Sequence, residues 1–171
     1  MRKLSLAVLS ILLAFICAGC SISPWESVAR ELSRLKTYED IIKRLPAMAT
    51  LVLSMDEAEI DANIFADTDM DSHRYAVPAY YAVEGTDWEC TLLCQNAKVA
   101  VFELTSVGSS VTPAEVEDII AYAVATYGAD YESSETVDAL AANTQLYIWE
   151  HTEIAFHSYT GDMGWIVIKF F

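Results

Sequence analysis

Basic residues are scarce in this chain, in which ten lysines and arginines stand against twenty-five aspartates and glutamates, for a net charge of −15. Nucleic-acid binding draws its affinity from basic side chains that replace the counterions of the phosphates. A surface with this excess of negative charge is repelled by phosphates instead. We therefore expect no nucleic-acid partner.

Glycine and histidine are also few, with six and three residues. No glycine-rich phosphate loop follows a predicted strand, and the Gly-x-Ser-x-Gly motif of serine hydrolases does not occur. The sequence consequently predicts no cofactor and gives no direct sign of a nucleophilic enzyme.

The longest apolar run stands at the amino terminus. Arg2 and Lys3 precede an apolar run over residues 4–15, and the small residues Ala18 and Gly19 lead to Cys20. A positive start, an apolar run and small residues form the layout of a secretory signal. The run is shorter than the roughly twenty residues that a membrane-spanning helix needs, so a removed signal is favoured over an uncleaved anchor.

The segment Cys17-Ala18-Gly19-Cys20 resembles the lipobox of bacterial lipoproteins, in which the last cysteine is lipidated and the signal is cut before it. Ala18 and Gly19 match the two positions before the cut, whereas Cys17 stands where an aliphatic residue is usual. The resemblance implies that residues 1–19 are removed and that Cys20 carries acyl chains such as palmitate. It also implies a lipid-anchored protein of the cell envelope, at the outer membrane in a cell with two membranes, because Ser21 and not aspartate follows Cys20.

The remaining residues 20–171 have the length of a single globular domain. They hold eight basic residues against twenty-five acidic ones, a net charge of −17. Residues 21–44 are nearly neutral, with five basic and four acidic groups, whereas residues 45–171 hold only three basic groups against twenty-one carboxylates. The acidic part is therefore the part more distant from the lipid.

Cys90 and Cys94 are the cysteines left after Cys20. An exported protein can form disulfides. If the segment is an extended strand, however, the two Cα atoms lie about 13 Å apart, and a disulfide needs about 4.4–6.8 Å. We favour two buried thiols, with a disulfide as the alternative if the chain bends between them.

Capping residues predict three helices. Ser23–Glu26 starts a helix over about 24–35, and Thr37 starts a shorter one that Pro46 interrupts. Thr112–Glu115 starts the clearest helix, over 112–128, which Gly128 ends. Residues 47–55 fit either a strand or a helix end, and a short helix is possible at 137–142.

Alternating apolar residues predict a series of strands, at 58–66, 75–83, 88–94, 99–104 and a final three-stranded meander at 146–149, 154–159 and 165–171. Pro78 bends the second of these, and residues 67–73 form a polar turn. Strands joined by short turns indicate the α+β class, with an antiparallel sheet. We expect the helix at 112–128 to cover one face of this sheet.

Asp67, Asp69 and Asp71 have the one-three-five spacing that begins a calcium loop. Ser72 replaces the glycine of that loop, and Pro78 stands where a bidentate glutamate is needed. A solvated turn is favoured, and a calcium-stabilised structural protein is the alternative.

His151, Glu153 and His157 lie within seven residues, and such groups ligate zinc or transfer protons. His157 falls on the strand face opposite Ile154 and Phe156, which favours surface histidines.

We expect a non-catalytic binding or scaffolding module for a protein, peptide or glycan of the envelope. The alternative is a hydrolase or metal-assisted enzyme that uses His151 or His157 with nearby carboxylates.

Overall fold

The computed structural model describes residues 23–108, 110–137, 143–158 and 163–171. The helices are α2 (Pro24–Leu32), α3 (Tyr38–Val52) and α4 (Pro113–Tyr127), with a short 3-10 turn η1 (Glu57–Glu59). The strands before α4 are β1 (Ala66–Asp69), β2 (Arg74–Ala76), β3 (Tyr81–Val83), β4 (Thr86–Gln95) and β5 (Lys98–Ser106). The strands after α4 are β6 (Glu132–Val137), β7 (Asn143–Trp149), β8 (Thr152–Ser158) and β9 (Gly164–Phe170).

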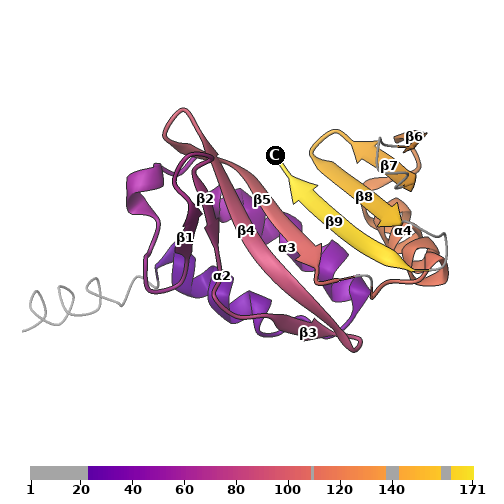
Figure 1. Cartoon of the computed structure of the whole chain (residues 1–171), viewed down its shortest axis with the longest axis horizontal. Helices are drawn as coiled ribbons and strands as arrows, with labels where there is room; N and C mark the ends of the chain where they lie inside the picture. Colours follow the sequence, from indigo (N-terminus) through magenta and orange to yellow (C-terminus); the bar gives the residue numbers. More distant parts are fainter. Residues whose placement is uncertain (1–22, 109, 138–142, 159–162) are drawn as a thin grey trace, which may run out of the picture.

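The strands form one antiparallel sheet, which confirms the predicted α+β class (Figure 1). Their order is β1-β2-β4-β5-β9-β8-β7-β6, and β3 also pairs with β4. The sheet therefore consists of two meanders that meet at their last strands, β5 and β9. Four residue pairs form this junction, from Phe102 opposite Phe170 to Thr105 opposite Val167.

Each meander follows a helix of fifteen residues, α3 in the first half and α4 in the second. Both helices begin with a threonine and a capping box, Thr37 with Asp40 and Thr112 with Glu115. The same order of elements, a helix followed by a meander, therefore occurs twice in the chain. No repeat is evident in the residues themselves, because the two halves share their topology and not their residue identities.

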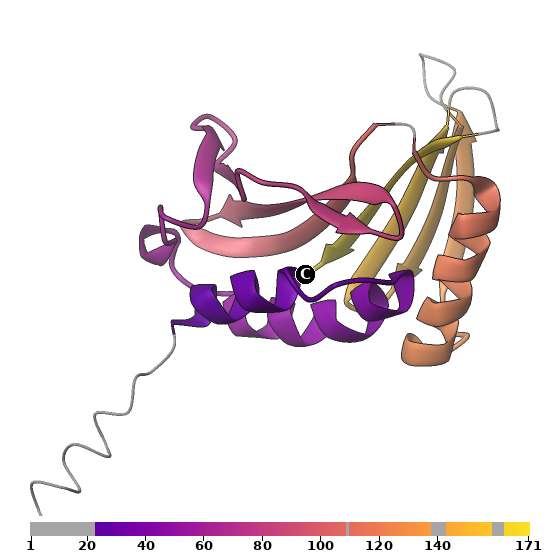
Figure 2. The same cartoon turned by 90° about the horizontal axis from the view of Figure 1, so that it is seen from below.

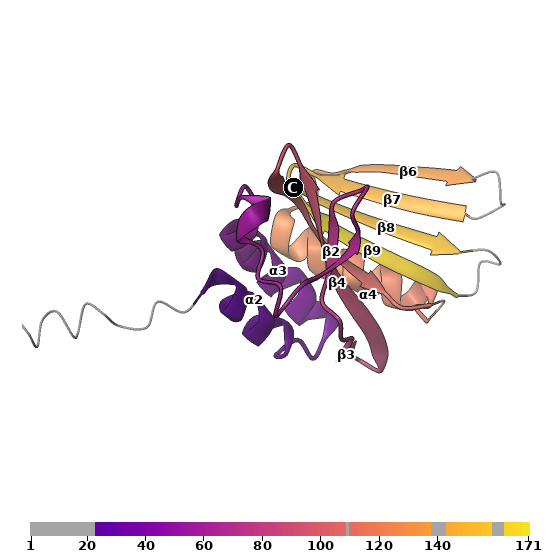
Figure 3. The same cartoon turned by 60° about the vertical axis from the view of Figure 1, so that its left-hand side comes forward.

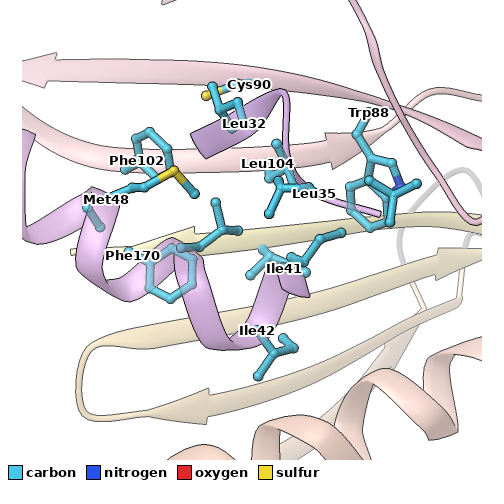
Figure 4. Close-up of a cluster of buried hydrophobic side chains, with 14 of the residues drawn as sticks. Leu32, Leu35, Ile41, Ile42, Met48, Trp88, Cys90, Phe102, Leu104 and Phe170 are labelled. Atoms are coloured by element: carbon cyan, nitrogen blue, oxygen red, sulfur yellow. The ribbon is translucent and has the colours of Figure 1, made fainter. Parts of the chain in front are cut away.

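The helices cover one face of the sheet, where α2 and α3 lie along the first meander and α4 lies beside the second (Figure 2). The expectation that the helix at 112–128 covers the sheet is confirmed. Figure 4 shows the core between α3 and the strands, where Trp88, Phe102, Leu104 and Ile42 are fully buried. Burial of each such side chain stabilises the fold by about 1.5–3 kcal/mol.

Helix α2 is fixed at its start by Trp25. The indole N–H of Trp25 donates to the carbonyl of Glu59 at 2.7 Å, and its ring packs edge-on against Phe65 at 5.4 Å. The helix ends at Leu32, a few residues before the predicted end.

Helix α3 continues through Pro46 to Val52, so the prediction that Pro46 interrupts it is wrong. Proline has no N–H, and within a helix this leaves the carbonyl of residue i−4 unpaired. Here that carbonyl belongs to Ile42, and the hydroxyl of Tyr127 on α4 donates to it at 2.6 Å. A contact from the second half of the chain therefore replaces the missing helical hydrogen bond, and burial raises the pKa of Tyr127.

The strand predicted at 58–66 is also wrong, because this segment holds η1 and a turn, and β1 begins only at Ala66. Asp61 explains the difference. Its carbonyl accepts from the N–H groups of Ile64 and Phe65, and its carboxylate accepts from the N–H of Asn63. Such local bonds compete with pairing in a sheet.

Pro78 divides the strand predicted at 75–83 into β2 and β3, which pair with different parts of β4. The final meander has four strands, not three, because β6 precedes it. Every residue of β6 is exposed, so the strand has no apolar alternation by which the sequence could reveal it. The helix expected at 137–142 lies outside the described residues except for Val137, which belongs to β6.

A double-mutant cycle can test whether the hydroxyl of Tyr127 replaces the helical hydrogen bond that Pro46 removes. Tyr127→Phe leaves the carbonyl of Ile42 unpaired and lowers the free energy of unfolding by about 1–3 kcal/mol. In a Pro46→Ala background the alanine N–H restores the helical bond, and the same substitution then costs less by about 1 kcal/mol. Urea unfolding of the four proteins measures this coupling. Equal costs of Tyr127→Phe in both backgrounds would contradict the account.

Candidate functional site

The face of the sheet away from the helices, called the open face below, carries a row of four charged side chains, one each from β2, β5, β9 and β8. Arg74 on β2 donates from Nη2 to Oε1 of Glu103 on β5 at 2.9 Å. Lys169 on β9 lies opposite Glu103 and donates from Nζ to Oε1 of Glu153 on β8 at 2.7 Å. The row alternates in sign and crosses the junction between the two meanders.

Glu103 is the most buried member of the row, with 5% of the residue exposed. Its Oε1 also accepts from the hydroxyl of Thr105 at 3.2 Å. A carboxylate this deeply buried is costly unless it is paired and hydrogen-bonded, and here Arg74 and Thr105 supply both. The row therefore gives the open face charges in fixed positions.

Half-exposed apolar and aromatic side chains lie on both sides of the charged row. By the register of the strands they are Leu93, Val101, Leu146, Ile148, Trp165 and Val167. Trp165 stacks on His157, with ring centroids 5.0 Å apart and planes at 17°. A mixture of fixed charges with accessible aromatic and aliphatic surface is typical of a protein-binding face.

The structure separates the predicted histidine site. His157 lies on the open face, as expected from its position opposite Ile154 and Phe156, and its Nδ1 is 2.9 Å from the hydroxyl of Thr144. His151 lies in the turn between β7 and β8. Glu153, the third residue of the predicted site, binds Lys169 instead. Within the described part of the chain, no three His, Cys, Asp or Glu residues are grouped so as to hold a metal ion.

His151 does line a hollow of about 390 Å³, together with Asp130 and Glu150. Its Nε2 is 3.6 Å from Oε1 of Glu150, and the two side chains are 75% and 87% exposed. Both side chains therefore extend into solvent and are not enclosed by the walls of the hollow.

Two of the three carboxylates of the predicted calcium site accept hydrogen bonds within their own turn. The carboxylate of Asp69 accepts from the N–H of Asp71 at 3.1 Å and from the hydroxyl of Ser72 at 2.7 Å. That of Asp67 accepts from the N–H of Asp69 at 3.1 Å. The bond from Ser72 is the largest cause that lowers the pKa of Asp69. The carboxylates of Asp67 and Asp69 therefore support the β1–β2 hairpin, and among the described residues none of the three aspartates belongs to a group that could hold a cation.

Cys90 and Cys94 are both free thiols on β4, the first buried and the second half-buried. Burial raises the pKa of Cys90, and the charges of Glu103 and Glu89 raise it further. Burial and the charge of Glu57 raise the pKa of Cys94 to about 11. A thiol needs a lowered pKa to act as a nucleophile at neutral pH. These environments work in the opposite direction.

Sequence reasoning missed a polar cluster beside Cys94. Oε1 of Glu57 on η1 accepts from the hydroxyl of Tyr75 at 2.8 Å and lies 2.7 Å from Nδ1 of His73. These contacts lower the pKa of Glu57 and raise that of Tyr75 to about 12. Eighteen residues separate Glu57 from Tyr75, and no motif links them, so only the fold brings them together.

Comparisons with protein-family models, with curated proteins and with solved structures found no significant match. None of the described helices has the length and apolar character that crossing a bilayer requires.

The environment of Cys94 predicts slow and pH-dependent alkylation. With a pKa of about 11, its thiolate fraction at pH 8 is about two hundredfold below that of a free cysteine. A thiolate of higher pKa is more nucleophilic, which offsets part of its lower abundance. We therefore expect iodoacetamide to react with Cys94 about tenfold more slowly than with a free cysteine. Mass spectrometry of the native Cys90→Ser variant follows Cys94 alone, and its rate should keep rising from pH 8 to pH 10. A rate that levels off below pH 9 would show a lowered pKa and revive the nucleophile hypothesis.

Proposed function

We propose that this protein is a lipid-anchored lipoprotein of the cell envelope that acts as a non-catalytic binding module. The observation that carries the proposal is the pattern that ends at Cys20, with Arg2 and Lys3, the apolar run and the two small residues before the cysteine. Two or more acyl chains hold a protein stably on a bilayer, whereas a single chain binds it only marginally.

The start of α2 supports a domain held close to the bilayer. Only residues 21–23 separate Cys20 from Pro24, the first residue of α2. Three extended residues span at most about 11 Å. On this proposal the folded domain lies directly beside the lipid and not at the end of a long linker.

The open face supports the binding role. It combines fixed charges at Arg74, Glu103, Lys169 and Glu153 with half-exposed aromatic and aliphatic side chains. The helices lie on the other side of the sheet (Figure 2). The partner expected there is a protein or peptide of the envelope, because alternating charges beside apolar patches match the chemistry of a polypeptide surface.

The anchor predicts the behaviour of Cys20→Ser. This substitution removes the acceptor of the acyl chains, and we expect the protein to move from the detergent phase to the aqueous phase in Triton X-114 partitioning. Cys17→Leu is the matched control, because it alters the neighbouring cysteine and leaves Cys20 in place. Mass spectrometry should find an acylated Cys20 at the amino terminus. An intact, unacylated amino terminus would overturn the anchor.

The binding role predicts a crosslink from the open face. A photoreactive amino acid in place of Val167 should give one discrete adduct in intact cells, because its side chain lies in the middle of the face. The same group in place of Tyr122, an exposed residue on α4, is the control and should give none. Equal labelling at both positions, or no adduct at Val167, would argue against this face as the binding surface.

A further inference from the structure

Among the described residues the sheet ends at β6, the outermost strand of the second meander, and no described strand pairs with its outer edge (Figure 3). All six of its residues are exposed, including Val137 at 70%. Alternate residues of an edge strand direct their N–H and C=O groups away from the sheet, where they are available to another chain.

The opposite edge of the sheet is protected, whereas β6 is not. β1 has four residues and an irregular register between Asp67 and Asp69, and both features discourage further pairing. β6 pairs with β7 over six consecutive residues without a shift and contains neither proline nor lysine. It therefore presents a regular strand edge of the kind that accepts an added strand.

The charge around β6 indicates which strand would bind there. Residues 107–171 contain ten carboxylates and a single basic residue, Lys169, which binds Glu153. β6 itself carries Glu132 and Glu135, which point to opposite faces because they are three residues apart. Asn143 donates to Oε1 of Glu135 at 2.7 Å and holds this carboxylate in place.

We propose that β6 binds an extended segment of a partner protein as an additional strand, and that this segment carries two basic residues three positions apart. In such a pairing the backbone bonds supply the affinity, and the basic residues lie opposite Glu132 and Glu135. A second copy of this chain is a poor occupant, since it would bring another Glu132 and Glu135, and no basic residue, to the same edge. The inference depends neither on the lipid at Cys20 nor on the open face.

The test uses the full chain in detergent and a labelled peptide, Thr-Lys-Thr-Val-Lys-Thr, with blocked ends. Fluorescence anisotropy measures its Kd, and two further peptides carry N-methyl groups on alternate residues in opposite phases. An added strand bonds to the edge through alternate residues only, so one methylated peptide should bind and the other should not. Hydrogen exchange of the β6 amides should slow in the presence of the unmodified peptide.

The variant Glu132→Gln/Glu135→Gln should raise the Kd about tenfold, because it removes both cross-strand charge pairs. The control Glu26→Gln/Asp118→Asn removes two exposed carboxylates from α2 and α4 and should leave the Kd nearly unchanged. Equal binding of the two methylated peptides would reveal non-specific charge attraction and overturn the proposal. Absence of binding at millimolar peptide, equal binding of a peptide with glutamate in place of lysine, or dimerisation of the protein through β6 would overturn it as well.

Discussion

The two halves of the molecule are joined along one seam, where β5 pairs with β9 on the sheet and α3 packs against α4 beneath it. The strand part of the seam is only four residue pairs long, but Phe102, Leu104, Ile168 and Phe170 bury their side chains on its helix side. Van der Waals contacts and the removal of apolar surface from water thus hold the meanders together.

The helix part of the seam depends on polar contacts that one half makes with the other. The hydroxyl of Tyr127 satisfies the carbonyl that Pro46 leaves unpaired, and the hydroxyl of Tyr38 donates to Oε1 of Glu115 at 2.8 Å. Glu115 also accepts from Thr112 in the cap of α4, and although burial raises its pKa, these hydrogen bonds lower the net value. Each half therefore completes hydrogen bonds that the other half lacks.

The seam also determines the charged row of the open face and the strands that form the two edges of the sheet. Glu103 and Lys169 face each other across it, so the charged row of the open face exists only when β5 and β9 pair. The same pairing joins the two meanders side by side in one sheet and leaves β1 and β6 at its outer edges. In the helical layer, Arg34, Lys43 and Arg44 pair with acidic residues of α2 and α3, so the opposite charges of residues 21–44 largely lie beside one another. The unbalanced negative charge belongs to the rest of the molecule.

The sequence by itself determined the elements whose signals are local. The capping boxes at Thr37 and Thr112 depend on residues three positions apart, and the strands β4, β5, β8 and β9 place buried apolar side chains at alternate positions on the face toward the core. The sequence also placed His157 on the face opposite the core. Only the tertiary structure decided how far α3 extends, because the bond that Pro46 removes is replaced by Tyr127, some eighty residues later. It alone revealed β6, which has no buried side, and it assembled the row from Arg74 to Glu153 from four strands. Contacts between residues distant in the chain leave no periodic pattern in the sequence, and they form only when the two meanders meet.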